Sequence, residues 1–312
     1  MKRAFVFPGQ GSQMPGMGQA LAAAFPAARQ LFDEVDEALS QHLSRLMFEG
    51  PESELMLTEN AQPALLAASL AVIRVLQSEA GFDIARQAAY VAGHSLGEYS
   101  ALAAAGALSV AEAARLVKRR GQAMQKAVPV GVGAMAALLG LDIEAARAVA
   151  EAAAQGQVCD LANDNSPGQI VVSGHRGAVE RAVALAAERG ARTIMLPVSA
   201  PFHCSLMSPA ADIMAEALAE TPLKAPLVPL VANAAAAATS DPEQIKELLV
   251  EQTTRMVRWR ETVLLFAANQ VEEVVEIGAG RVLAGLVKRI DRTLSARSVG
   301  TPADVDALVP LF

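Results

Sequence analysis

Cysteine and histidine are scarce in this sequence, and their scarcity excludes several kinds of protein. There are two cysteines and four histidines among 312 residues. Cys159 and Cys204 are too few to form a disulfide framework, and no metal-ligand spacing surrounds them. We therefore expect neither a disulfide-rich secreted protein nor a metal site. We expect a soluble protein that works in the reducing cytoplasm. It should be a monomer, with a small oligomer as the alternative.

Long hydrophobic runs are also missing. The longest stretch without a charged residue, Thr193 to Ala211, contains three prolines and a histidine, so it would make a poor transmembrane helix. The N-terminus has only a short apolar run before Pro8, so we expect no signal peptide. The net charge of −7 argues against nucleic-acid binding, and an anionic substrate would have to meet local positive charge.

The chain does contain enough apolar sequence for a substantial core, since 53% of its residues are hydrophobic. Strands alternate with helical patterns over 1–128 and 199–312, which predicts an α/β fold with a mostly parallel, doubly wound sheet. Between these segments, residues 129–198 follow the order β-α-β-β-α-β of a ferredoxin-like unit. We predict that this smaller domain is inserted into the larger, discontinuous one.

Periodicity and breaker residues assign the main elements. The expected strands span 2–7, 88–92, 227–232 and 272–277 in the large domain, and 134–141, 158–163, 169–173 and 191–198 in the small one. The main expected helices span 58–77, 100–105, 110–128, 142–154, 177–189, 209–220, 241–251, 260–269 and 282–289. The alanine-rich stretch 234–238 is expected to be loose.

The most informative stretch is Gly93-His94-Ser95-Leu96-Gly97, between a short apolar run and an alanine-rich helix. This G-x-S-x-G pattern is typical of a nucleophile elbow, a sharp strand-to-helix turn with a serine at its tip. The residues on either side of such a turn pack too closely to carry a Cβ atom. The helix directs its N-terminal amides toward charge that develops near the serine. A plain glycine-containing turn is the alternative.

A serine nucleophile needs a base, because its own pKa lies far above neutrality. Of the four histidines, His203 is the best candidate, since its proline-rich loop lies where the chain re-enters the large domain. A loop histidine without a catalytic role is the alternative. The aspartates between Ser95 and His203 are Asp142, Asp160 and Asp164, and none is well placed to complete a triad. A Ser–His dyad oriented by a backbone carbonyl is the simpler prediction.

Two further features suit an acyl substrate. Arg120 follows two other basic residues on a predicted helix, and its guanidinium could hold a substrate carboxylate through two hydrogen bonds. A favourable contact of a basic helix end with the helix dipole is the alternative. The loop after the first strand carries Gln10 in a glycine-rich context, but it lacks the spacing of a phosphate-binding loop or a dinucleotide fingerprint.

Several motifs occur together and in one order along the chain. They are Phe7-Pro8-Gly9-Gln10-Gly11-Ser12-Gln13, Gly93-His94-Ser95-Leu96-Gly97-Glu98-Tyr99, Arg120-Gly121 with Met124-Gln125, Asn165-Ser166-Pro167-Gly168-Gln169, and Phe202-His203. Through these motifs the chain resembles, over essentially its full length, the malonyl-CoA:acyl carrier protein transacylases of fatty-acid synthesis. The resemblance implies an α/β-hydrolase-like core with a ferredoxin-like insert.

The resemblance also implies a role for each matched residue. Ser95 would take the malonyl group as an ester, and His203 would act first as its base and then as the acid toward the leaving thiolate. The backbone amides of Gln10 and Leu96 would form the oxyanion hole. Arg120 would bind the free carboxylate of malonate.

By the same resemblance, the main-chain carbonyl of Gln252 would orient the imidazole. Malonyl-CoA would acylate the serine, CoA would leave, and the phosphopantetheine thiol of acyl carrier protein would take the malonyl group, without a cofactor or metal. The acidic carrier would need a basic patch on this protein. The candidates for this patch are Arg255, Arg258 and Arg260, or Lys288 and Arg289.

Other interpretations stay open. The malonyl-transfer subunit of malonate decarboxylase and a free-standing polyketide acyltransferase share every motif above. A serine hydrolase or thioesterase would pass the acyl group to water, and a carrier-binding scaffold would leave Ser95 idle. The chain departs from the family at Gly278-Ala279-Gly280, where proline is often in the middle. Phe202 before His203 resembles the variant of malonyl-selective acyltransferase domains, and this resemblance favours malonyl over methylmalonyl.

Overall fold

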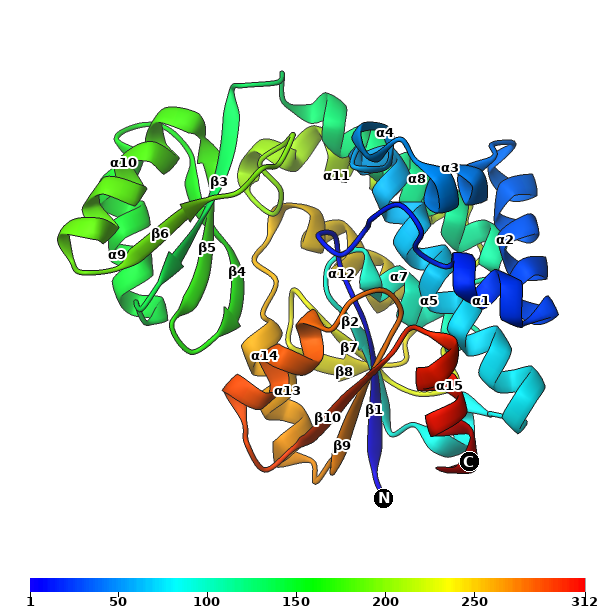
Figure 1. Cartoon of the computed structure of the whole chain (residues 1–312). Coiled ribbons are helices and arrows are strands. Elements are labelled where there is room, and N and C mark those ends of the chain that lie inside the picture. The colour runs from blue at the N-terminus through cyan, green and yellow to red at the C-terminus, as the bar shows by residue number, and fades with distance from the viewer. Residues whose placement is uncertain (312) are drawn as a thin grey trace.

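The computed structural model describes residues 1–311, which fold into two β-sheets (Figure 1). The strands of the first sheet are β1 (Arg3–Phe7), β2 (Tyr90–Gly93), β7 (Leu230–Ala232), β8 (Ala237–Thr239), β9 (Glu273–Ile277) and β10 (Ser295–Val299). The strands of the second sheet are β3 (Gly133–Leu139), β4 (Cys159–Ser166), β5 (Gln169–His175) and β6 (Arg192–Met195). One internal segment of the chain therefore supplies the whole second sheet.

Most helices lie in the segments that connect these strands, and α15 follows the last strand. The first eight are α1 (Gln19–Ala24), α2 (Pro26–Leu39), α3 (Leu43–Glu49), α4 (Glu52–Leu55), α5 (Thr58–Ala80), α6 (Ile84–Gln87), α7 (Gly97–Ala104) and α8 (Val110–Ala127). They are followed by α9 (Ile143–Ala154), α10 (Arg176–Glu188), α11 (Ser208–Glu220), α12 (Pro242–Thr254), α13 (Trp259–Ala268), α14 (Val282–Ile290) and α15 (Pro302–Leu308). Short 3-10 helices cover Ser205–Met207 and Val309–Leu311.

The first sheet has the strand order β10-β9-β1-β2-β7-β8; its neighbouring strands run parallel, except that β8 runs antiparallel to β7. Every residue of β1 is buried. Phe5 and Phe7 pack into the core that includes α2, α5, α7 and α8, whereas Ala4 and Val6 face α13 and α14. Strands buried on both faces are expected to be apolar throughout. The predicted mostly parallel α/β sheet is thus confirmed.

The second sheet is antiparallel, with the order β4-β5-β3-β6. Ala136 and Leu138 of β3 point to the face that α9 and α10 cover. Successive residues of a strand point to opposite faces, so Met135 lies on the other face, where it packs with Met124 of α8 and Phe202. This second face therefore forms an apolar wall toward the helices of the first sheet.

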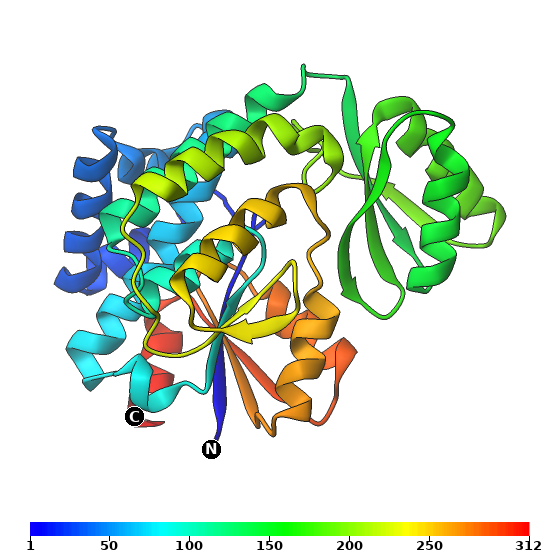
Figure 2. The same cartoon turned by 180° about the vertical axis from the view of Figure 1, so that it is seen from behind.

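Backbone hydrogen bonds join β4 to the segment between α12 and α13. The N–H of Val257 donates to the carbonyl of Ala162 at 2.9 Å, and the N–H of Asp164 donates to the carbonyl of Val257 at 3.0 Å. Figure 2 shows this segment as it passes from α12 to α13 beside the second sheet. An ion pair between Asp164 and Arg260 of α13 lies at the same junction.

Several elements differ from the predictions. Helix α5 continues to Ala80, and α7 begins at Gly97 instead of Ser100. The alanine-rich stretch 234–238, predicted to be loose, leads into β8, which pairs with β7; alanine has a low strand propensity, so composition did not reveal an edge strand. Strand β10 was not predicted, because its polar, partly exposed side chains form no apolar run.

Helix α5 is, within residues 1–311, the one helix that is long and apolar enough to cross a membrane. It is mostly buried inside the protein, where it packs with α2, α7 and α8. A helix that is apolar around most of its circumference is also typical of a protein core, and that is the position α5 occupies.

Candidate active site

Ser95 lies at the tip of a sharp turn between β2 and α7. Its φ of 55° is in the left-handed region, which non-glycine residues rarely adopt. A Cβ atom on Gly93 would lie 1.9 Å from the carbonyl carbon of Gly97, and one on Gly97 would lie 2.2 Å from the carbonyl oxygen of Phe7. Both glycines are therefore required by close backbone contact, as the elbow pattern predicts.

His203 faces Ser95 from the loop that precedes α11. The Nε2 atom of His203 lies 2.7 Å from the Oγ atom of Ser95, and its Nδ1 atom lies 2.8 Å from the backbone oxygen of Gln252. A carbonyl can only accept, so Nδ1 carries the proton and donates to Gln252. Nε2 is then left to accept from the Ser95 hydroxyl.

The environment keeps the His203 imidazole neutral. Burial and, after it, the positive charge of Arg120 lower the pKa of His203 to about 3, against the opposing effect of the hydrogen bond with the Gln252 carbonyl. A neutral imidazole is the form that can take a proton from a serine hydroxyl.

Arg120 reaches the same point from α8, and it is only 1% exposed. Its Nη1 donates to Oε1 of Gln62 at 2.8 Å, and its Nη2 donates to Oε1 of Gln252 at 2.8 Å and to Oγ of Ser95 at 2.9 Å. The next residue, Gly121, allows this approach, since a Cβ atom there would lie 2.7 Å from the backbone of α5.

The hydrogen-bond acceptors of Arg120 are all uncharged. Within residues 1–311 no carboxylate forms an ion pair with this guanidinium, and its Nε atom has no hydrogen-bond partner. A buried charge without a counter-ion is costly. Guanidinium groups bind carboxylates through paired, charge-assisted hydrogen bonds, so this position is suited to an anionic ligand.

Two polar residues that sequence reasoning missed, Asn233 and Glu98, lie beneath the elbow. Oδ1 of Asn233 accepts from the N–H of Ser95 at 2.8 Å, and its Nδ2 donates to the carbonyl of Gly93 at 2.7 Å. The backbone N–H of Asn233 donates to Oε1 of Glu98 at 2.6 Å. The position of Asn233 in the sequence could have identified it, because it directly follows β7, and α/β proteins bind ligands at the edge of the sheet where parallel strands end.

Ser95, Arg120 and His203 line a cavity of about 360 Å³, which also includes the predicted residues Gln10 and Leu96. Leu96 is the residue before the first turn of α7. The remaining lining residues are Gly11, Gln13, Met56, Gln62, His94, Met124, Met135, Asn163, Leu196, Pro197, Val198 and Phe202. The cavity is therefore polar around Ser95 and largely apolar elsewhere.

A second cavity of about 230 Å³ shares Gln10, His94 and Asn163 with the first. Asn165 and Gln169 add further side-chain amides to its lining. The two cavities together offer an extended chain several hydrogen-bonding groups beside Ser95.

Two of the other histidines, His94 and His175, have different partners. Nε2 of His94 lies 2.9 Å from Oδ1 of Asn165, and burial lowers the pKa of His94 although this hydrogen bond acts to raise it. Nδ1 of His175 accepts from the N–H of Val158 at 3.0 Å. Among residues 1–311, no group of three or more histidine, cysteine and acidic side chains could hold a metal ion.

The three aspartates considered as a third member of a triad also bond elsewhere. Asp142 caps α9 by accepting from the N–H of Ala145 at 2.8 Å. Asp160 accepts from the N–H and the hydroxyl of Ser205, and Asp164 pairs with Arg260. The carbonyl of Gln252 therefore stands where a triad would have a carboxylate.

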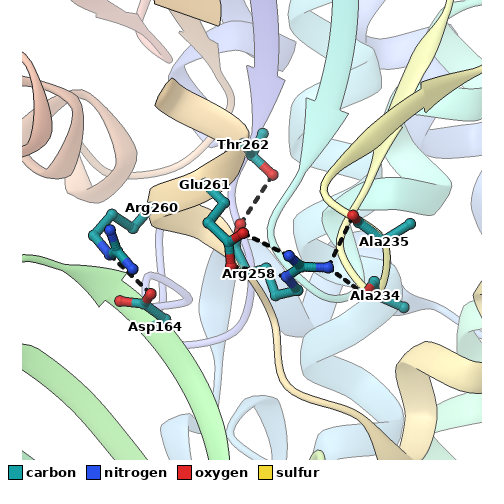
Figure 3. A network of polar contacts seen from close by, with 7 residues as sticks. All are labelled: Asp164, Ala234, Ala235, Arg258, Arg260, Glu261 and Thr262. Atoms are coloured by element: carbon teal, nitrogen blue, oxygen red, sulfur yellow. Dashed lines mark hydrogen bonds and ion pairs between the residues drawn. The ribbon is translucent and has the colours of Figure 1, made fainter. Parts of the chain in front are cut away.

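Two of the arginines proposed for a carrier-binding patch are engaged within the protein (Figure 3). Arg258 donates to both carboxylate oxygens of Glu261, at 2.8 and 2.5 Å, and to the carbonyl of Ala235 at 2.9 Å. Arg260 donates to Oδ2 of Asp164 at 2.8 Å. Their charges are thus largely neutralised, which makes them weaker candidates for docking an acidic partner.

Known proteins resemble this chain over almost its whole length. Residues 4–310 match the model of a family described as the acyl transferase domain. The chain is 47% identical over 309 residues to the malonyl CoA-acyl carrier protein transacylase of Escherichia coli (strain K12), with 99% of each chain covered.

Solved structures are similar over the same length. An acyl-carrier-protein-S-malonyltransferase from Bartonella henselae has 52% identity and a TM-score of 0.97, with 100% of this chain and 99% of that one covered. A malonyl-transacylase in complex with a type II PKS acyl-carrier protein has 45% identity and a TM-score of 0.96, with both chains fully covered.

Proposed function

The chain belongs to the acyl transferase family, and we propose that it moves a malonyl group from malonyl-CoA to the phosphopantetheine thiol of acyl carrier protein through an ester of Ser95. The observation that carries this proposal is the pair of contacts made by the Ser95 hydroxyl. It lies 2.7 Å from the His203 imidazole and 2.9 Å from the Arg120 guanidinium. A nucleophile, a base and a buried cation that forms no direct ion pair suit an acyl group that ends in a carboxylate.

The proposed chemistry has two half-reactions. Nε2 of His203 takes the hydroxyl proton while Oγ of Ser95 attacks the thioester carbonyl, and the tetrahedral intermediate then expels the CoA thiolate, which receives the proton from His203. The carrier thiol then gives its proton to His203 and attacks the ester in the same way, which regenerates Ser95. The neutral, Nδ1-protonated imidazole supports this role for His203.

The backbone N–H groups of Gln10 and Leu96 are the proposed oxyanion hole. Support comes from their position in the same cavity as Ser95 and from Leu96 at the start of α7, where helix amides point outward. Each donor of this kind is worth about 3–4 kcal/mol of transition-state stabilisation.

Arg120 is the proposed binding group for the malonyl carboxylate. A carboxylate could take the place of Ser95 Oγ as acceptor of Nη2, which would leave the hydroxyl to His203. Its negative charge would also offset the effect by which Arg120 lowers the pKa of His203. A neutral acetyl group would leave the buried guanidinium unpaired, so the site should discriminate against it.

The finer description of the fold belongs to the same proposal. Residues 1–128 and 199–312 would form an α/β-hydrolase-like domain, of which residue 312 lies outside the described residues, and 129–198 would form a ferredoxin-like insert. The order β4-β5-β3-β6 with two helices on one face supports the second assignment.

We expect a cytoplasmic monomer that uses its two substrates without a cofactor. Side-chain amides in the second cavity suit the amide groups of pantetheine. The complex of a similar malonyl-transacylase with a type II PKS carrier makes polyketide synthesis the second candidate pathway beside fatty-acid synthesis. A malonate decarboxylase subunit would share the same half-reaction.

Mass spectrometry after treatment with malonyl-CoA tests the covalent step. The protein should gain roughly 86 Da, the mass of one malonyl ester, located on Ser95 and removed by acyl carrier protein that carries its phosphopantetheine. Ser95→Ala should gain nothing. If Ser95→Ala retained full transfer activity, the mechanism would be wrong.

Labelled malonyl-CoA separates transfer from hydrolysis. We expect slow release of malonate without the carrier and fast transfer when it is added. If malonate were released without the carrier as fast as malonyl is transferred in its presence, the protein would be a hydrolase and the transferase proposal would be wrong.

A further inference from the structure

Glu98 is a buried carboxyl in the first turn of α7, three residues after Ser95 and 1% exposed. Both of its oxygens accept from N–H groups: Oε1 from the backbone of Asn233 at 2.6 Å, and Oε2 from the side-chain amide of Gln252. Burial raises the pKa of Glu98 to about 8, although these two hydrogen bonds and the charge of Arg120 act to lower it. Because an N–H donor faces each oxygen, both oxygens of Glu98 act as acceptors.

Gln252 connects Glu98 to the groups that face the cavity. Its Nε2 donates to Glu98 and, at 2.9 Å, to the backbone carbonyl of Ser95. Its Oε1 accepts from Nη2 of Arg120 at 2.8 Å, and its backbone oxygen accepts from His203. Carboxylates and carbonyls only accept and guanidinium groups only donate, so this is the one orientation of the amide that satisfies all its neighbours.

We propose that Glu98 is a positioning residue for substrate selection: it fixes the Gln252 amide so that the amide oxygen holds Arg120 toward Ser95. The inference rests on the proposed malonyl transfer and adds a residue that does not itself touch the substrate. Without the carboxylate, Gln252 could turn its amide group, and an NH₂ would then face the guanidinium. Arg120 would lose one of its uncharged acceptors and its place beside the serine.

Glu98→Gln tests this with almost no change of shape. The N–H of Asn233 is a backbone donor, so the new amide must turn its oxygen to Asn233 and its NH₂ to Gln252. The NH₂ groups of the new glutamine and of Gln252 then face each other, unless Gln252 rotates its amide and presents its NH₂ to Arg120. Either arrangement weakens the hold on Arg120 and leaves the contact between Ser95 and His203 in place.

The measurement is the ratio of kcat/KM for malonyl-CoA to kcat/KM for acetyl-CoA in acylation of the full chain. Loss of one hydrogen bond to a charged group corresponds to about a tenfold change, so Glu98→Gln should lower this ratio about tenfold. If a smaller fraction of a variant is folded, both rates fall by the same factor and their ratio stays unchanged. A ratio equal to that of the unmodified protein would overturn the proposal.

Glu276→Gln is the matched control. Glu276 is fully buried in β9 and accepts from the backbone N–H groups of Leu283 and Ala284 and from the hydroxyl of Ser298. The substitution creates the same conflict between donors, but Arg120 does not depend on it. The substitution should lower the free energy of unfolding and leave the malonyl-to-acetyl ratio of kcat/KM unchanged. If Glu276→Gln lowered this ratio as much as Glu98→Gln does, general destabilisation would explain both effects and the proposal would be overturned.

A double-mutant cycle tests the route through Gln252. Gln252→Ala keeps the backbone carbonyl that His203 contacts and removes the side-chain amide. In this background Glu98→Gln should lower the ratio no further, because coupled residues are non-additive. Fully additive losses would overturn the proposal. If the unmodified protein formed no malonyl ester, the proposed function itself would fail; if it formed the ester and the ratio did not respond, only the role of Glu98 would fail.

Discussion

Two groups of arginines in this protein are held in opposite ways. Arg120 is fully buried and donates to amide and hydroxyl oxygens, none of which carries a charge. Arg258 and Arg260 are partly exposed, and each donates to a carboxylate (Figure 3). All three come from helix ends or helix surfaces that look alike in sequence, where each could be a binding group or a solvated cation.

The contrast indicates that the hydrogen-bond partners of an arginine, more than its burial, decide whether it is available to bind an anionic ligand. Arg260 and Asp164 neutralise each other and tie α13 to β4. Arg120 is placed beside the Ser95 hydroxyl and forms no direct ion pair, which is unfavourable for a buried cation. Binding sites commonly retain such unfavourable groups, because a ligand supplies the missing interaction.

Arg120→Ala should have the largest effect. Removing one partner of a buried charge pair costs about 3–5 kcal/mol, which corresponds to about a 150- to 5,000-fold loss of malonyl transfer. Acetyl transfer, which offers no carboxylate, should fall far less. Steady-state kinetics with both CoA esters measure the difference, and equal losses would refute carboxylate binding by Arg120.

Arg119→Ala is the control for that substitution. Arg119 is the preceding residue, is 41% exposed and contacts Glu216 and Glu220 on the surface. Exposed ion pairs contribute about 0–1 kcal/mol, so both transfer rates should stay unchanged.

Arg260→Ala should act on stability and leave the malonyl-to-acetyl ratio unchanged. It leaves the carboxylate of Asp164 buried and unpaired, with an expected loss of about 1–3 kcal/mol in the free energy of unfolding. Burial already raises the pKa of Asp164, and Arg260 opposes this, so the variant should raise that pKa further.

The sign of the pH dependence follows from that shift. When the pKa of a carboxyl is higher in the folded than in the unfolded protein, the free energy of unfolding falls as the pH rises from the unfolded pKa to the folded pKa. Compared with the unmodified protein, Arg260→Ala should therefore be least stable near neutral pH and recover part of the loss near pH 4. Denaturant unfolding at the two pH values measures this, and an equal loss at both would contradict it.

The smallest expected effect is that of a lower pH on the acylation rate through protonation of His203. With the pKa of His203 near 3, the imidazole is neutral at pH 7.5 and at pH 5.5. The value of kcat/KM for acetyl-CoA, which reports the free enzyme, should change less than about twofold over this range. A histidine with the ordinary pKa of about 6.5 would lose about tenfold, so a tenfold decline would show that His203 is not held neutral.

Much of the site could be predicted because its signals are local. The close packing of Gly93, Ser95 and Gly97 is a property of five consecutive residues, and the structure has that turn. The order β-α-β-β-α-β between 133 and 195 follows from periodicity and is confirmed. His203 was selected by its loop and by elimination, and its ring lies against Ser95 as expected.

The supporting residues could not be predicted, because their partners are remote in sequence. Asn233 contacts the backbone of Ser95 and Gly93, which are 138 and 140 positions away. Glu98 was in view as part of a motif, but nothing in the motif indicates that its carboxyl meets an amide 154 positions later. Exposed or polar edge strands such as β8 and β10 were missed for a related reason, since pairing with a neighbour defines them more than their own composition.

The sequence by itself determined the elbow at Ser95, the α/β class and the inserted segment, since each depends on short-range spacing and on burial patterns within single elements. Only the tertiary structure decided which cations are available for binding. Arg120 meets acceptors 58 and 132 positions away, and Arg260 meets a carboxylate 96 positions away. The charge that remains on each guanidinium is set by which acceptors the fold brings to it, and no local pattern contains that information.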